Sequence, residues 1–271
     1  MPLPGVYTAN KKNGEIYYRS SITYNNKHIS LGSFNTEKAA HMAYQSAIKI
    51  LYKKKGIKKS IPTADAFHAL RSPISFDKWI MLLNFRDNGI YCRNPIYLQH
   101  KYFLYYIEEH TPLKFDAEDL FYYMNHRIMR RGGHLFVSDY GMQVNILSRY
   151  GIKNFAVAGR DYRFANGDPT DFRYGNIKII NRYHGVQKSI AKGQEVYTTR
   201  IHINGNYIVG KYESEVEAAI AYNKAAFLLR KKGLKKDFPE NYIDGVDHIT
   251  YAKLYNGLRI SKKLRDLPNF D

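Results

Sequence analysis

Residues 16–47 read IYYRSSITYNNKHISLGSFNTEKAAHMAYQSA, and this stretch decides the fold of the first part of the chain. Its first nine residues alternate apolar and polar side chains, as a half-buried strand does. Asn25-Asn26 tolerates the left-handed backbone of a tight hairpin turn, after which a further strand ends at Phe34. Thr36 is a candidate helix N-cap, and the alanines beyond it recur at helical spacing. The stretch therefore predicts paired strands followed by a helix that lies close against them.

The same plan recurs at residues 195–225, which read EVYTTRIHINGNYIVGKYESEVEAAIAYNKA. Each copy opens with Gly-Val, at residues 5–6 and 185–186, and the second copy turns at Asn204-Gly205 and caps its helix with Ser214. Both copies close on a basic tail, KKKGIKK or RKKGLKK, in which Gly56 and Gly233 predict the helix stops. Small helix residues match in order: Ala40, Ala43, Tyr44 and Ala47 correspond to Ala218, Ala221, Tyr222 and Ala225. This self-similarity predicts one three-stranded sheet-plus-helix module that occurs twice.

A period of two assigns the side chains of each central strand to two faces. In the first copy Tyr18, Ser20 and Ile22 share one face. The face that carries isoleucine is expected to pack on the helix, as is the face of Tyr197, Thr199 and Ile201 in the second copy. The opposite faces, with Arg19 or with Arg200 and His202, are expected to stay open.

The net charge of +18 is concentrated in the two copies. Residues 1–60 carry eleven Lys/Arg and two acidic residues, and residues 183–236 carry ten and four. The rest of the chain is nearly balanced. Clustered positive charge favours a polyanionic partner, most simply nucleic acid, and the tail lysines would meet its phosphates.

Several classes of protein do not fit the sequence. A single cysteine, Cys92, excludes an internal disulfide and a cysteine-rich metal site. The chain has no apolar run long enough to span a membrane and no signal-peptide pattern at Met1. We therefore expect a cytoplasmic, nucleoid-associated protein with no membrane, no cofactor, no metal and no small-molecule substrate, and the sequence leaves its protein partners open.

Each copy resembles the DNA-binding domain of the Apetala/ethylene-response-factor (ERF) class. The resemblance rests on the strands around Tyr18 and Tyr197, on Leu31-Gly32-x-Phe34 and Gly210-x-Tyr212, and on the alanine-rich helices. The class reads the major groove with the outward face of its sheet, although it usually carries more arginine and tryptophan there. Carried over, the resemblance implies these DNA-binding residues: Tyr7, Arg19, Ser21, Thr23, His28, Ser30 and Ser33 in the first copy, and Gln187, Lys188, Arg200, His202, Asn206, Ile208 and Lys211 in the second.

The middle of the chain resembles the ββα-metal core of HNH homing endonucleases, in which an ERF-type module commonly follows the nuclease. Residues 162–179 carry Asn166-Gly167-Asp168 and then Asp171, Arg173 and Asn176, in the family's order. The family's metal-binding Asp is replaced by Arg163, its general-base His by Phe164 and a structural Asn by Phe172, which leaves only Asn176. Phenylalanine cannot take up a proton, and arginine supplies a cation where the metal would bind. The resemblance thus implies a pseudoenzyme without catalytic residues.

Other signals of a metal site are weak. The acidic Asp116, Glu118 and Asp119 are most simply residues of a helix's first turn. His110, His126 and His134 lack the spacing of metal ligands.

We predict an α+β chain of two three-stranded antiparallel sheet-plus-helix modules that flank an inactive HNH-like core. The expected segments are 1–60 (ERF-like module), 61–88 (linker with a short helix), 89–182 (core), 183–245 (ERF-like module) and 246–271 (tail). The function expected is sequence-preferring binding of double-stranded DNA, as in a transcription regulator derived from a homing endonuclease. Two alternatives stay open: an active nicking or homing endonuclease, and a nonspecific nucleoid or RNA-binding protein.

Overall fold

The structure is a computed structural model that describes residues 3–52 and 61–270. It confirms the predicted α+β class, because helices and several small antiparallel sheets make up the described chain. Two compact units divide the chain: residues 1–146 with 168–176, and residues 147–167 with 177–271. Within the described ranges, no helix combines the length and the apolar character needed to cross a bilayer.

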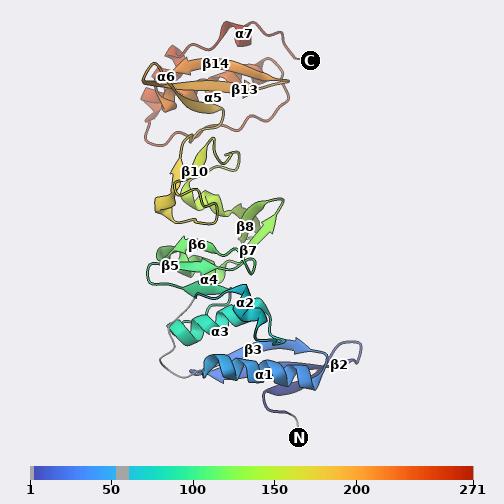
Figure 1. The fold of residues 1–271 in the computed structure, drawn as a ribbon. Coiled ribbons are helices and arrows are strands. Elements are labelled where there is room, and N and C mark those ends of the chain that lie inside the picture. The colour runs from blue at the N-terminus through green and yellow to red at the C-terminus, as the bar shows by residue number, and fades with distance from the viewer. Residues whose placement is uncertain (1–2, 53–60, 271) are drawn as a thin grey trace. The chain divides into compact units, whose positions relative to one another are not determined.

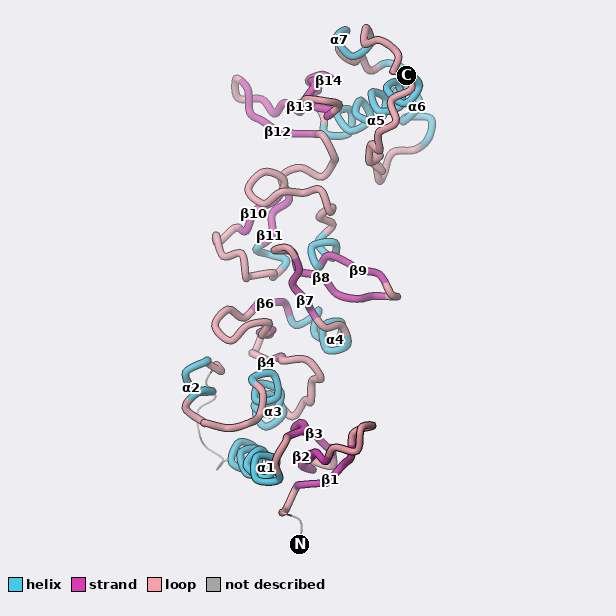
Figure 2. Tube along the Cα trace, turned by 90° about the vertical axis from the view of Figure 1, so that its right-hand side faces the viewer, coloured by secondary structure: helices cyan, strands magenta, loops and turns pink. Residues whose placement is uncertain are grey.

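The first unit begins with the predicted sheet-plus-helix module (Figure 1). Strands β1 (Val6–Asn10), β2 (Ile16–Tyr24) and β3 (Lys27–Phe34) pair antiparallel in that order. Helix α1 (Glu37–Leu51) packs on one face of this sheet, and Figure 2 shows it beside the three strands. Among the described residues of the module, no helix covers the other face.

Local signals fix the ends of these elements. Asn25 and Asn26 adopt φ angles of 45° and 59°, as a tight two-residue hairpin turn requires. The Thr36 hydroxyl accepts a hydrogen bond from the Ala39 amide at 3.2 Å, which confirms the predicted N-cap. The small residues that let the helix approach the sheet are fully buried: Ala40, Ala43 and Ala47.

Both modules contain a β-bulge at the same place in the sheet. Two neighbouring residues of the central strand face three residues of the last strand, so that one residue, Leu31 or Val209, is extra. Because the extra residue lies in the last strand, the central strand keeps its alternation between the two faces.

Residues 61–88, expected to be a linker with a short helix, form two helices instead. These are α2 (Ala64–His68) and α3 (Phe76–Asn88). Trp79 of α3 is buried in the same hydrophobic cluster as Ile22 of β2. The segment therefore completes the core of the first module, because its apolar side chains are buried together with those of the module's sheet and helix.

Two further antiparallel sheets complete the first unit. Their elements are β4 (Ile96–Leu98), β5 (Tyr102–Tyr105), β6 (Leu113–Asp116), η1 (Ala117–Asp119), α4 (Leu120–Asn125), β7 (Ile128–Arg131), β8 (His134–Asp139) and β9 (Met142–Asn145). Residues 168–176, with η3 (Tyr174–Asn176), join them because Phe172 stacks on Phe115 with ring centroids 5.5 Å apart. The predicted core of residues 89–182 is thus shared between the two units.

The second unit consists of a hairpin, the second module and the tail. Its elements beyond η2 (Ile146–Tyr150) are β10 (Tyr162–Phe164), β11 (Ile177–Ile179), β12 (Val186–Ala191), β13 (Gln194–His202), β14 (Asn206–Tyr212), α5 (Glu215–Lys231), α6 (His248–Gly257) and α7 (Lys262–Arg265). Four side chains of the tail pack back on the module: Tyr251, Leu254, Leu258 and Ile260.

The second module follows the sequence prediction except at its hairpin turn. The Ser214 hydroxyl caps α5 by accepting the Glu217 amide at 3.1 Å, and Gly233, at φ 91°, follows the end of the helix. His202 pairs with Asn206, so three residues fill the turn and the expected left-handed pair at residues 204–205 does not form. The counterpart helix stop at residue 56 lies outside the described residues.

Candidate nucleic-acid interface

The strand register of the first module gathers all seven predicted residues on the face opposite α1. They form three rows across the sheet: Tyr7, Arg19 and Ser33; Ser21 and Ser30; Thr23 and His28. We call this surface the first open face. All of its members are exposed except Ser21, which is buried.

Contacts within the first open face hold several side chains in place. The Arg19 guanidinium donates to the Tyr17 hydroxyl from Nε at 3.0 Å and from Nη2 at 2.6 Å. Thr23 Oγ1 lies 3.5 Å from Nδ1 of His28. Tyr7 is 58% exposed, so its aromatic side chain is accessible at the surface. The face therefore offers donors, acceptors and an aromatic surface without an acidic residue in its three rows.

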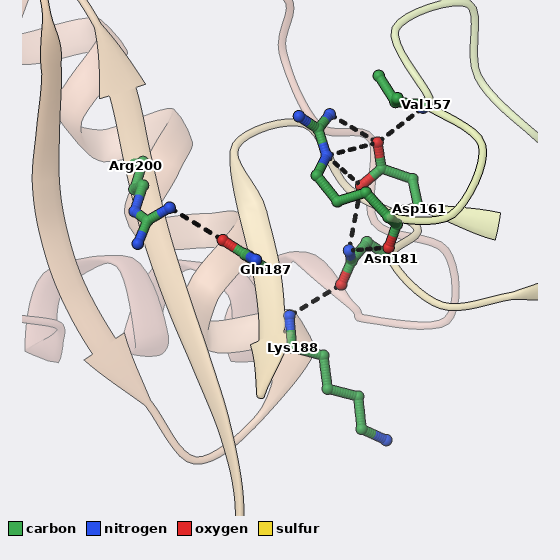
Figure 3. A network of polar contacts seen from close by, with 7 residues as sticks. Val157, Asp161, Asn181, Gln187, Lys188 and Arg200 are labelled. Carbon is green, nitrogen blue, oxygen red and sulfur yellow. Dashed lines mark hydrogen bonds and ion pairs between the residues drawn. The ribbon is translucent and has the colours of Figure 1, made fainter. Parts of the chain in front are cut away.

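The second module builds the equivalent second open face. Its rows are Gln187, Thr198 and Lys211; Arg200 and Ile208; His202 and Asn206. Arg200 Nη1 donates to Oε1 of Gln187 at 2.9 Å, and Figure 3 shows this pair bridging β13 and β12. Thr198 was missed by sequence reasoning, although the alternation of β13 already places it on the same face as Arg200 and His202.

Lys188 does not belong to the second open face, so its predicted role in DNA binding does not follow from that surface and stays a prediction. It pairs with Tyr197 across the sheet and points to the opposite side from its neighbour Gln187. Its ammonium group is bound to the Glu195 carboxylate and lies 5.8 Å from the centre of the Tyr197 ring. The hydrogen bond to Glu195 raises the pKa of Lys188.

The basic tail of the second module is partly committed to the protein itself. Arg230 forms an ion pair with Glu240 at 2.6 Å, Lys232 donates to the carbonyl of Leu267, and Lys236 donates to that of Ile203 at 3.0 Å. Lys231 and Lys235 are exposed. The tail of the first module, residues 53–59, lies outside the described residues.

The positions that resemble a nuclease core fall in both units. Arg163 and Phe164 lie on β10, which pairs with β11 as a short hairpin. Phe172 is buried against Phe115, and Asn176 donates from Nδ2 to the Asp171 carbonyl at 2.8 Å. Between β11 and β12 the described chain contains no helix that would complete a ββα unit.

Acidic side chains near these positions make contacts within the protein. Asp116 accepts the Tyr174 amide at 2.7 Å, and the fully buried Asp171 is bound by Arg173 at 2.6 Å and lies 3.8 Å from Lys114. Burial acts to raise the pKa of Asp171, but the bonds from Arg173 and the nearby cations outweigh it and lower the pKa. Among the described residues, no three His, Cys, Asp or Glu side chains gather in a way that could hold a metal ion.

Cys92 is a buried thiol, and burial raises its pKa to about 12. Such a thiol is overwhelmingly protonated at neutral pH and is therefore a weak nucleophile.

In comparisons with family models, curated proteins and solved structures, no match to the chain was found.

Proposed function

We propose that the chain is a sequence-preferring double-stranded DNA-binding protein that reads DNA through its two open faces. The observation that carries the proposal is the strand register, which puts every predicted recognition residue except Lys188 on one of these two faces. Positions chosen at random along alternating strands would divide between the two sides of each sheet. We infer that the chain acts as a transcription regulator and that it is derived from an HNH homing endonuclease.

The chemistry of the faces supports duplex DNA as the partner. A three-stranded sheet can enter the major groove, where each base pair presents a distinct pattern of donors and acceptors. Arg19 and Arg200 can donate two parallel hydrogen bonds to guanine, and the hydroxyl, amide and imidazole groups around them can pair with donors or acceptors on base edges. The net charge of +18 supplies attraction to phosphates.

A search of a randomised duplex pool with the full chain tests the proposal. We expect a short motif to be enriched and the chain to bind that duplex more tightly than a random duplex of equal length. Double-stranded RNA should compete poorly, because its major groove is too narrow for a sheet. Enrichment of no motif, or equal competition by RNA, would favour the nonspecific nucleoid or RNA-binding alternative.

The endonuclease alternative makes a separate prediction. The purified chain with Mg²⁺ or Mn²⁺ should leave supercoiled plasmid and its selected duplex uncut, because Arg163 and Phe164 stand where the family has its metal ligand and base. Gel electrophoresis after prolonged incubation measures this. Cleavage that disappears in Asn176→Ala would establish an active enzyme and reject the pseudoenzyme proposal.

A further inference from the structure

A hollow of about 230 Å³ lies at the start of β12, beside the second open face. One wall is built from residues of that face, among them Gln187, Arg200 and His202. The other wall is the loop of residues 155–161, which precedes the module in sequence and includes Arg160. The hollow is therefore a place where the preceding segment and the open face can touch the same ligand.

The first module has a corresponding hollow, but that hollow has no wall with a cationic side chain like Arg160. Equivalent residues of its open face line one side, including Tyr7, Thr23 and His28. Its other side is formed by side chains of α1 and the residue that follows it, namely Tyr44, Ile48 and Tyr52. None of the described residues that line this first hollow is Lys, Arg, Asp or Glu, so the charged wall is a feature of the second module.

The loop of residues 155–161 is anchored to the second module through Asp161 and Asn181. Asp161 is buried and accepts hydrogen bonds from the Val157 amide at 2.8 Å and from Asn181 Nδ2 at 3.0 Å. The Asn181 side chain also accepts the Lys188 amide of β12 at 2.8 Å (Figure 3). On the other side of the loop, the Phe155 ring packs edge-on against His184 with centroids 4.6 Å apart.

Asp161 also orients Arg160. The Arg160 guanidinium donates to the carboxylate from Nη2 at 2.7 Å and from Nε at 3.1 Å. The arginine side chain is 55% exposed, whereas that of Asp161 is 6% exposed. Within the described chain, every hydrogen bond of this guanidinium goes to Asp161 through Nε and Nη2, so Nη1 remains available to a ligand.

We propose that Arg160 binds a backbone phosphate of duplex DNA held on the second open face, and that Asp161 positions it. The proposal rests on the DNA-binding function inferred above. A guanidinium held by a buried carboxylate loses little side-chain freedom on binding, and its free edge forms strong charge-assisted hydrogen bonds to phosphate. Arg200 on the opposite wall reads bases, and Arg160 fixes the duplex against it.

Arg160→Gln tests the proposed phosphate binding, and Lys253→Gln is the matched control because Lys253 is an exposed cation on α6, which packs against α5. Affinity is measured for the selected duplex and for a random duplex over a series of salt concentrations. Arg160→Gln should weaken both duplexes by about three- to tenfold and lower the log–log salt slope by about 0.9, because one phosphate fewer is neutralised. Lys253→Gln should change neither by a comparable amount.

Asp161→Asn separates positioning from simple charge. The substitution raises the net charge by one, so charge alone predicts tighter binding to both duplexes. Positioning predicts weaker binding. Without its charged partner the Arg160 side chain is less restrained in the free protein, so it loses more conformational freedom when it binds phosphate. Arg160→Lys, which keeps the charge but not the planar guanidinium, should also bind more weakly than the wild type. This variant replaces Asp161→Asn as the test if Asp161→Asn lowers the melting temperature of the protein.

The outcomes distinguish this inference from the function on which it rests. If Arg160→Gln matches Lys253→Gln, or if a stably folded Asp161→Asn binds more tightly than the wild type, the proposed role of Arg160 is wrong while the DNA-binding function stands. If the wild-type chain binds no duplex, the proposed function fails, and the Arg160 inference fails with it.

Discussion

Replacing Gly185 with alanine is expected to lower the free energy of unfolding of the second module by about 3 kcal/mol. Gly185 has a φ angle of +74°, where a side chain is strained. A Cβ atom there would lie 2.4 Å from Cδ2 of Tyr222 and 2.5 Å from the carbonyl oxygen of Arg200. The Tyr222 ring is fully buried and the carbonyl belongs to β13, so neither can move aside without disturbing the sheet.

Gly193→Ala is the matched control for this substitution. Gly193 lies in the same module at a φ angle of +79°, but its Cβ would meet nothing within 4 Å. It should therefore incur only the cost of the strained backbone, about 1 kcal/mol. Urea-induced unfolding of the full chain gives the two losses of stability, and amide hydrogen exchange in β12–β14 assigns them to the second module. Equal losses in the two variants would mean that the Tyr222 ring does not approach Gly185 closely.

The substitution Arg200→Ala is expected to weaken binding to the selected duplex by about ten- to a hundredfold while leaving affinity for random DNA nearly unchanged. Arg200 is exposed on the second open face, and its bond to Gln187 already orients the guanidinium. A bidentate pair with guanine is worth roughly 1–3 kcal/mol of discrimination, and alanine can form neither bond. Competition titrations with both duplexes at one salt concentration measure the difference.

The paired control replaces the exposed Lys231 and Lys235 with alanine. Lys231 is the last residue of α5 and Lys235 follows it, so neither belongs to a strand of the second open face, and their removal should change both affinities by the same factor. It should also flatten the salt dependence, by about 0.9 in log–log slope for each phosphate that is no longer neutralised. If Arg200→Ala also lowers both affinities by one factor, the second open face is an electrostatic surface only. A nonspecific nucleoid protein would then be the better proposal.

Features with a local physical cause could be predicted from the sequence. The alternation along β2 and β13 assigns side chains to faces because successive residues of a strand point in opposite directions. Thr36 and Ser214 cap their helices because a hydroxyl at that position satisfies an amide that the helix leaves unpaired. The same alternation excludes Lys188 from the second open face, since it adjoins Gln187 in one strand.

Features that join distant parts of the chain could not be predicted in this way. The burial of Trp79 in the same hydrophobic cluster as Ile22 has no periodic signal, because an amphipathic helix shows that it needs a partner but not which one. The bonds of Asp161 to Asn181 likewise connect two irregular segments whose composition is that of ordinary loops. The sequence alone therefore does not distinguish Arg160 from the other arginines of the chain.

The shared register of the two modules bears on how freely each can change over time. At every equivalent position of the open faces the copies differ, as Tyr7 differs from Gln187 and Ser33 from Lys211, whereas several inward positions keep the same residue, as Ile22 and Ile201 do. A side chain that projects away from the core can usually be exchanged with little loss of stability. If both open faces bind DNA as proposed, mutational drift can retune one copy without unfolding it and without altering what the other copy binds. The chain would then carry two recognition elements whose preferences are inherited together but diverge separately.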